Sequence, residues 1–425
     1  MRKQRLKKMD LDLYSETLDN GLLVNLVAKK DVKNVYATFS TSYGSFDNDF
    51  VPLGEKNIFN APLGIAHFLE HKLFETENGE EPFAFFTKNG ADSNAFTSHQ
   101  NTSYLFSGIG HLEENVEYLL NFVQQPYFTD ANVEKEKGII DQEIKMYDDI
   151  PYFKLFDKAQ YNTFINHPLK HPIIGTSESI NSISKEDLYK CYKTFYHPSN
   201  MYLTIVGNIE PEKLMGLIKE NQSKKEFAKP KKIKQEKYKE PDNIERDYEE
   251  IIFDVELPKV ALLYKINTSG FEINRLQKYL DIYFRVKADE TSPLLERLKS
   301  KLYIHDNITI YTVPAETHIL FVLLFESMDY KKVLTELEKE ISDKQIDEKS
   351  LNRKKKVSMS RYIYRSDNIT GIAYKINNDI IHHGKVIIDE AKEIESLNID
   401  EMNDILSKIS LDNKTTTVLK RKEES

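Results

Sequence analysis

The stretch that decides the fold reads Gly64-Ile-Ala-His-Phe-Leu-Glu-His-Lys-Leu-Phe-Glu75. It is apolar at most positions, and its few polar residues recur at a helical spacing, which predicts a helix from about Gly64 to Glu75. His67 and His71 are four residues apart, so on a helix they lie on one face, close enough to share a metal ion. Glu70 directly precedes His71 and flanks the same face. Polar groups held in such apolar surroundings need partners.

The order of these three residues is the inverted zinc-peptidase pattern H-x-x-E-H. Neutral imidazole suits zinc, and a catalytic zinc site takes three protein ligands. Glu70 is then a general base rather than a ligand, because it can take a proton from the attacking water and deliver it to the leaving amine. The alternative is a surface helix that carries these residues by coincidence, with 11 histidines among 425 residues. The apolar neighbours and the specificity of the pattern favour the metal site.

A third metal ligand can come from the helical pattern at 130–148. Glu136 and Glu143 are seven residues apart there, so they fall on one helical face, two turns apart, within an apolar stripe. Carboxylates in an apolar stripe must be paired, protonated or bound to metal. Each could instead form a salt bridge with a lysine or an arginine. The pattern alone does not choose between Glu136 and Glu143 as the ligand.

Length and composition predict a two-domain cytoplasmic protein. A chain of 425 residues suits two domains of about 200 residues each. A balance of 59 basic against 68 acidic residues, a net charge of -9, argues against a nucleic-acid binder. Cys191 is the single cysteine, which excludes an intrachain disulfide and suits a reducing compartment. The basic residues 1–8 precede aspartates rather than an apolar stretch, and the longest apolar run, 319–325, is only strand-length, so we expect neither a signal peptide nor a membrane span.

Residues 222–248 separate two halves of similar pattern. This segment is polar, highly charged and contains proline, which predicts a solvated interdomain linker. Each half ends with an apolar helix followed by a strand, at 184–206 and at 399–420, which indicates a duplicated α+β domain. We expect a catalytic zinc-binding domain at 1–221 and a homologous domain without the zinc motif at 249–425.

Short-range signals predict individual elements within these halves. Asn20-Gly21 before an apolar run predicts a tight turn between two strands. Residues 93–97 and 103–107 are typical of paired strands. In the second half we expect strands at 248–256, 258–267, 307–313 and 316–326, and helices at 272–288, 329–342, 346–365 and 368–382.

Taken together, these motifs resemble the pitrilysin/insulinase family of zinc peptidases, which includes the mitochondrial processing peptidase, and most of all its short cytoplasmic bacterial members. In that family a second helix with two glutamates seven apart follows the H-x-x-E-H helix. Here Glu143 follows His71 by 72 residues. The resemblance implies that Glu143 is the third zinc ligand and that Glu136 supports the site from behind the ligands. The segment Asn94-Ala-Phe-Thr97 is similar to the family's substrate-binding edge strand, which implies that Asn94, Ala95, Phe96 and Thr97 bind substrate.

The resemblance also implies a fold and an activity. The fold is α+β, with two homologous domains that each pack a mostly antiparallel sheet against helices, as in the LuxS/processing-peptidase-like metallohydrolases. The activity is that of a Zn²⁺-dependent endopeptidase that hydrolyses peptides or unfolded segments, such as a precursor peptide. The alternative is a non-catalytic or regulatory zinc-binding subunit of a two-chain peptidase complex.

The second half matches the family less well. Family members often hold the substrate carbonyl with an arginine and a tyrosine seven residues apart, whereas Arg297 and Tyr303 are six apart here. The pair is therefore either displaced or supplied by a partner. Because the family closes its chamber with two such chains, the resemblance implies a homodimer, or a heterodimer with a homologous chain that can be inactive. Peptides are the expected substrate, and neither nucleic acid nor membrane is an expected partner.

Overall fold

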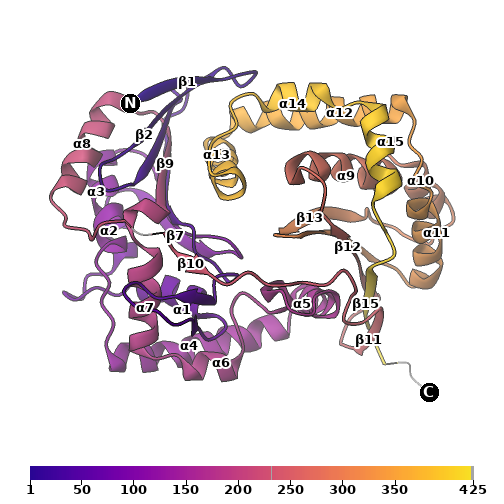
Figure 1. The fold of residues 1–425 in the computed structure, drawn as a ribbon, viewed down its shortest axis with the longest axis horizontal. Helices are drawn as coiled ribbons and strands as arrows, with labels where there is room; N and C mark the ends of the chain where they lie inside the picture. Colours follow the sequence, from indigo (N-terminus) through magenta and orange to yellow (C-terminus); the bar gives the residue numbers. More distant parts are fainter. Residues whose placement is uncertain (231, 423–425) are drawn as a thin grey trace. The chain divides into compact units, whose positions relative to one another are not determined.

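A computed structural model describes residues 1–230 and 232–422, which pack into two compact units (Figure 1). The first unit consists of Met1–Ile144, Pro172–Lys237 and Arg361–Ala391, and the second of Lys145–His171, Tyr238–Ser360 and Lys392–Ser425. Residue 231 of the predicted linker and residues 423–425 of the predicted second domain lie outside the described residues. Each unit therefore includes a segment from the other half of the chain.

A seven-stranded sheet forms the centre of the first unit. Its strands are, in spatial order, β1 (Arg2–Leu6), β2 (Leu11–Thr17), β3 (Leu23–Ala28), β9 (Met201–Gly207), β4 (Val35–Thr41), β8 (Thr102–Gly108) and β7 (Ala91–Thr97). Neighbouring strands are antiparallel except β3 and β9, which are parallel. The predicted turn between β2 and β3 is confirmed, and Gly21 has a φ of 93° there. Among the described residues β7 pairs only with β8, so its outer edge is free of strands.

Helices cover both faces of this sheet. The helices of this part of the chain are α1 (Ile65–Lys72), α2 (Pro82–Lys88), α3 (Leu112–Val123), α4 (Asp130–Asp148), α6 (Ser177–Ser182), α7 (Lys185–Phe195), α8 (Pro211–Ser223) and α13 (Ile369–His383). Alternate residues of a strand point to opposite faces. On β4, Thr41 Oγ1 donates to Phe195 O of α7 at 2.7 Å, whereas Thr38 Oγ1 accepts from Asn377 Nδ2 of α13 at 2.9 Å. The helix from the second half of the chain thus lies on the face opposite α7.

A five-stranded sheet forms the centre of the second unit. Its spatial order is β11 (Tyr248–Ile252), β15 (Lys414–Lys420), β12 (Lys259–Asn267), β14 (His318–Glu326) and β13 (Thr309–Ala315). The first pair is parallel and the others are antiparallel, as in the series β3-β9-β4-β8-β7 of the first unit. This repeat confirms the predicted fold class.

The remaining elements complete the chain. They are the helices α5 (Pro151–Thr163), α9 (Ile273–Ala288), α10 (Pro293–Ser300), α11 (Tyr330–Ser342), α12 (Glu348–Tyr364), α14 (Glu390–Ser396) and α15 (Ile399–Lys408), the short 3-10 turns Pro168–Lys170, Pro198–Asn200 and Arg365–Asp367, and a small sheet of β10 (Lys234–Gln235), β5 (Asp49–Val51) and β6 (Phe59–Asn60). The sequence did not predict α5, which packs against β12 and β15.

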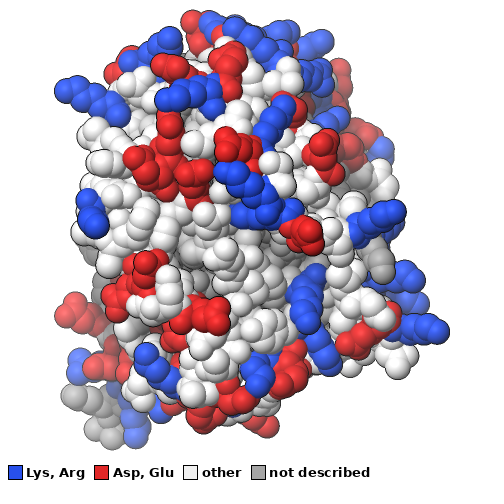
Figure 2. All heavy atoms as spheres, turned by 90° about the vertical axis from the view of Figure 1, so that its left-hand side faces the viewer, with Lys and Arg blue, Asp and Glu red and all other residues white. Residues whose placement is uncertain are grey.

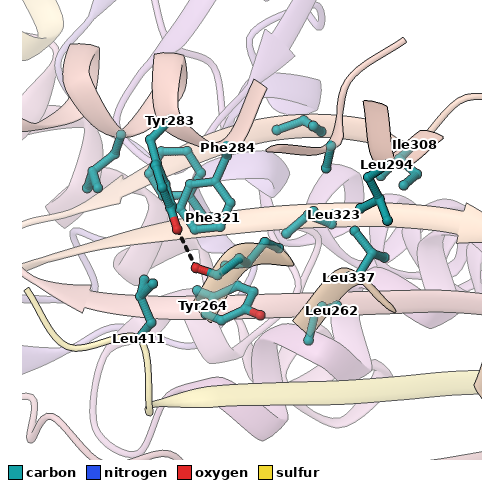
Figure 3. Close-up of a cluster of buried hydrophobic side chains, with 14 of the residues drawn as sticks. Leu262, Tyr264, Tyr283, Phe284, Leu294, Ile308, Phe321, Leu323, Leu337 and Leu411 are labelled. Carbon is teal, nitrogen blue, oxygen red and sulfur yellow. Dashed lines mark hydrogen bonds between the residues drawn. The ribbon is translucent and has the colours of Figure 1, made fainter. Parts of the chain in front are cut away.

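Figure 3 shows the core of the second unit between its sheet and α9. Phe284 of α9 stacks on Phe321 of β14, with ring centroids 4.3 Å apart. The hydroxyl of the buried Tyr283 donates to Ile341 O, so the polar end of this ring is satisfied. Burying each such side chain contributes roughly 1.5–3 kcal/mol to folding.

The segment 222–248 is held at two points. In the first unit, β10 pairs antiparallel with β5. In the second unit, Glu240 is fully buried, accepts hydrogen bonds from the main-chain N–H groups of residues 165–167 at 2.7–3.0 Å, and forms an ion pair with the buried Lys265. A buried carboxylate needs such partners. The expectation of a solvated segment therefore fails at Glu240, because composition does not reveal which single charge finds buried partners.

The surface agrees with the overall charge. On the face drawn in Figure 2, basic and acidic side chains are interspersed around an uncharged area, and no extended basic field is visible there. Within residues 1–230 and 232–422, no helix is long and apolar enough to cross a bilayer.

Gly64, which precedes α1, tests the local packing. Its φ is +83°, and a Cβ atom there would lie 2.2 Å from Ile174 O. We expect Gly64→Ala to lower the free energy of unfolding by about 2 kcal/mol or more, because the left-handed backbone and the clash both oppose alanine. Gly138→Ala on α4 is the control, since no atom outside its helix lies within 4 Å of the added Cβ. The control should be neutral or more stable by up to ~1 kcal/mol. Equal urea midpoints for both variants would contradict this packing.

Candidate metal centre

Helix α1 carries the three residues of the H-x-x-E-H motif. Its other side chains are mostly buried and pack towards β7 and β8. The buried apolar residues on this helix are Ile65, Ala66, Phe68 and Leu69. His71 lies about one helical turn after His67, and their ring centroids are 4.6 Å apart. The apolar residues thus fix the helix, and the fixed helix sets the two imidazoles side by side.

Helix α4 brings a carboxylate to these imidazoles. Glu143 Oε2 lies 3.8 Å from His67 Nε2 and 3.7 Å from His71 Nε2. One ligand atom from each of the three residues lies within 4.8 Å of the others. The structure therefore brings together His67, His71 and Glu143.

Glu136 occupies a different place from Glu143, although both lie on α4. The Nδ1–H of His71 donates to Glu136 Oε1 at 3.0 Å. This bond leaves His71 Nε2 on the side of Glu143. The geometry thus separates the two glutamates that the spacing alone could not distinguish, and it supports Glu143 as ligand and Glu136 as the group behind it.

Glu70 is buried beside β7. Thr97 Oγ1 donates to Glu70 Oε2 at 2.6 Å, which ties the edge strand to the motif helix. The sequence assigned Thr97 to substrate binding, and this contact with Glu70 was missed because it depends on the register of α1 against β7.

The other predicted substrate residues, Asn94, Ala95 and Phe96, also lie on β7. The Ala95 N–H donates to Asn94 Oδ1 at 2.8 Å. The ring centroid of Phe96 lies 6.4 Å from that of Tyr374 on α13. Tyr374 was also missed, because nothing in the sequence places α13 against the first sheet.

Arg297 and Tyr303, whose spacing differs from that of the family's arginine–tyrosine pair, lie in the second unit. Arg297 Nη2 donates to Glu340 Oε2 at 2.9 Å and forms an ion pair with it. Its guanidinium is therefore engaged with α11.

Burial and neighbouring charges set the protonation of the site. Burial lowers the pKa of His67 to about 3, so this imidazole stays neutral, which is the form that binds zinc. For His71, burial lowers the pKa, but the hydrogen bond and the charge of Glu136 outweigh burial and raise it. Burial also raises the pKa of Glu70, although the bond from Thr97 opposes the shift. A raised pKa suits a general base, because the group holds an acquired proton more firmly.

This donor set fits zinc. Two imidazole nitrogens and one carboxylate are three protein ligands, which leaves one tetrahedral position open. Bonds of 2.0–2.1 Å place tetrahedral ligand atoms about 3.4 Å apart. The 3.7 and 3.8 Å separations around Glu143 therefore need only a small contraction.

Comparison with known proteins places this site in a family. The model of "Insulinase (Peptidase family M16)" matches residues 56–177, and that of "Peptidase M16 inactive domain" matches 182–357. An uncharacterized zinc protease, YmfH of Bacillus subtilis (strain 168), is 45% identical over 300 residues, which is 70% of this chain and 70% of the relative. The chain belongs to the M16 insulinase family. The resemblance seen in the sequence is thereby confirmed, and the first matched stretch contains both α1 and Glu143.

Other proteins are similar to this chain in sequence or in fold. A second uncharacterized zinc protease of the same organism, YmxG, is 33% identical over 153 residues, covering 34% of this chain and 37% of its own. The crystal structure of an M16-like peptidase from Alicyclobacillus acidocaldarius has a TM-score of 0.92 at 29% identity and covers 97% of this chain and 99% of its own. A protease from Helicobacter pylori, with a TM-score of 0.80 at 20% identity and coverage of 96% and 99%, shares the fold.

The two glutamates of α4 should differ in their effect on metal binding. Glu143→Ala should abolish stoichiometric zinc binding, because it removes the only carboxylate oxygen near both Nε2 atoms among the described residues. Glu136→Ala should weaken zinc binding roughly ten- to a hundredfold, the usual cost of losing a partner behind a ligand. Glu134→Ala, on the same helix with a side chain 75% exposed, should leave zinc binding unchanged. Elemental analysis and chelator competition measure all three, and loss of zinc in Glu136→Ala but not in Glu143→Ala would reverse the assignment.

Proposed function

We propose that the chain is a cytoplasmic zinc metalloendopeptidase that hydrolyses peptides or unfolded segments, with processing of a precursor peptide as one such reaction. The observation that carries the proposal is the convergence of His67, His71 and Glu143, with Glu70 one residue before His71. Membership of the M16 family supports it, as does the description of YmfH as a zinc protease.

His67, His71 and Glu143 would hold the metal. A zinc ion there supplies Lewis acidity, both to a water molecule and to the scissile carbonyl. Glu136 keeps the His71 ring turned through its bond to Nδ1. These side chains come from two helices rather than from loops, so the site is built in advance of metal binding.

Glu70 moves the proton. Thr97 fixes one carboxylate oxygen, Oε2, and the other oxygen takes the proton of the attacking water. The same carboxyl group then returns the proton to the leaving amine. Because only 8% of Glu70 is exposed, bulk water does not compete freely for this proton.

The substrate would extend β7. This strand contacts α1 and is the last strand of its sheet, and an extended peptide can pair with its free edge through main-chain groups. We propose that a substrate carbonyl replaces Asn94 Oδ1 as the acceptor of the Ala95 N–H. Phe96 and Thr97 flank this position on alternate faces of the strand. Recognition of this kind depends little on side chains, which suits a range of peptides.

Replacing Glu70 by glutamine separates catalysis from metal binding. Glutamine is nearly isosteric and its carbonyl oxygen can still accept from Thr97, but it cannot take up the proton. We expect Glu70→Gln to keep zinc content and melting temperature while cleavage falls on the order of a hundredfold or more. Glu134→Gln serves as the exposed control. Full activity of Glu70→Gln would sink the mechanism. Wild-type chain that binds zinc but cleaves no peptide of a library, alone or with candidate partner chains, would favour the non-catalytic subunit instead.

We also propose that the active form is a dimer. The cluster of metal ligands lies in the first unit, the arginine–tyrosine pair of the family has no match at the same spacing here, and Arg297 is paired with Glu340. A homologous chain would supply the missing contacts and cover α1, and excluding water strengthens polar interactions at the site. The partner is a homologous, catalytically poor chain, with a second copy of this chain as the alternative.

Assembly should therefore control activity. We expect weak cleavage by the isolated chain at high dilution and clear stimulation when a homologous partner or a higher concentration of the same chain is added. Analytical ultracentrifugation alongside a peptide assay measures both properties. A strictly monomeric chain with full activity at high dilution would rule the dimer out.

A further inference from the structure

Lys72 is a lysine buried completely in the first unit. It follows His71 directly on α1, and its exposed fraction is 0%. Removing an ammonium group from water is costly unless it is paired and hydrogen-bonded. The H-x-x-E-H motif does not include this position, so the motif gives no reason for a charge there.

Three acceptors surround the Lys72 ammonium. Nζ lies 2.8 Å from Glu75 Oε2, 3.1 Å from Asn132 O and 3.4 Å from Glu136 Oε2. Glu75 is half-buried and lies just after α1, whereas Glu136 is nearly buried on α4. The lysine thus links the end of the motif helix to the helix that carries both predicted site glutamates.

Glu136 uses its two oxygens for two different partners. Oε2 faces Lys72 at 3.4 Å, and Oε1 accepts from His71 Nδ1 at 3.0 Å. With both oxygens engaged, the carboxylate cannot rotate without breaking a contact, and its negative charge has a buried counterion. The contacts therefore run from Lys72 through Glu136 to His71, whose Nε2 faces Glu143 at 3.7 Å.

We propose that Lys72 is a positioning residue for the metal centre, which acts through Glu136 to fix the ring of His71 with Nε2 towards the metal. The inference rests on the proposed function, since it takes His71 as a ligand. It goes beyond that function by assigning a role in metal binding to a cation that touches none of the three ligand atoms. Without Lys72, the Glu136 carboxylate loses its buried counterion and its fixed orientation, and His71 is free to turn.

A merely structural lysine would behave differently. Such a residue would hold α1 to Glu75 and Asn132, and its loss would lower the melting temperature without a specific effect on zinc. Glu75→Gln provides the matched control, because Glu75 is the nearest carboxylate to Nζ but its ion-pair partners among the described residues are Lys72 and Lys135, not a ligand histidine. The two roles are therefore separable by zinc affinity.

The test is a double-mutant cycle on zinc affinity, measured for the purified full chain by competition with a chromophoric chelator. The variants are Lys72→Met, Glu136→Gln, the double variant and Glu75→Gln, with melting temperatures recorded in parallel. We expect Lys72→Met to weaken zinc binding about tenfold or more, in line with the cost of losing supporting partners. In the Glu136→Gln background the same substitution should change affinity by less than about threefold, because its route to His71 is already cut. Glu75→Gln should stay within about twofold of wild type.

Two results would overturn the inference. One is a Lys72→Met chain that folds and binds zinc as tightly as wild type. The other is an equal loss in the wild-type and Glu136→Gln backgrounds, which would mean that Lys72 does not act through Glu136. If Lys72→Met does not fold, the zinc affinity of Lys72→Gln is measured in its place and judged by the same two results, since this substitution removes the charge but keeps a hydrogen-bond donor. Failure of the wild-type chain to bind zinc, or no loss of zinc in His71→Ala, would instead refute the proposed metal site itself.

Discussion

A charge buried away from water must be paired, and the packing of α4 against α1 follows from this constraint. Glu136 of α4 reaches both Lys72 and His71 of α1 only when the two helices lie side by side. Separating them would leave the buried Glu136 carboxylate without these two partners and the Lys72 ammonium with Glu75 as its remaining counterion, which is unfavourable. The same contact carries Glu143, two turns further along α4, to the Nε2 atoms of both histidines. The geometry of the metal centre is therefore a consequence of how the interior pairs its charges.

The fold is duplicated, but among the described residues the candidate metal centre lies in the first unit alone. The five strands of the second unit repeat the order and directions of β3-β9-β4-β8-β7. Strands β12 and β13 are the counterparts of β4 and β7. The chain between β12 and β13 contains α9, which buries Tyr283 and Phe284 in the core shown in Figure 3. In the first unit, the chain between β4 and β7 contains α1, which carries His67, Glu70 and His71 instead. One scaffold thus serves an apolar core in one unit and a polar centre in the other, which shows that the function belongs to particular side chains rather than to the fold.

Much of the site could be predicted from local spacing, because helical periodicity is a local property. The i, i+4 spacing of His67 and His71 placed them on one helical face, and the seven-residue spacing of Glu136 and Glu143 placed both in one apolar stripe of their helix. Which glutamate approaches the Nε2 atoms depends on the register of α4 against α1, and the spacing of residues within one helix does not determine that register. The contact of Thr97 with Glu70 depends in the same way on the register of a strand against a helix. The position of α13 on the first sheet was beyond prediction, because an amphipathic pattern shows that a helix is covered but not by which part of the chain.

The proposed peptidase mechanism requires a zinc ion held by His67, His71 and Glu143, and anomalous diffraction tests this requirement most directly. Crystals of the wild-type chain grown with zinc should be measured on both sides of the zinc absorption edge. We expect one strong anomalous peak about 2.0–2.2 Å from both Nε2 atoms and from a Glu143 oxygen, with Glu136 still bonded to His71 Nδ1. A peak coordinated by Glu136 in place of Glu143, or full zinc content with no peak at these residues, would contradict it.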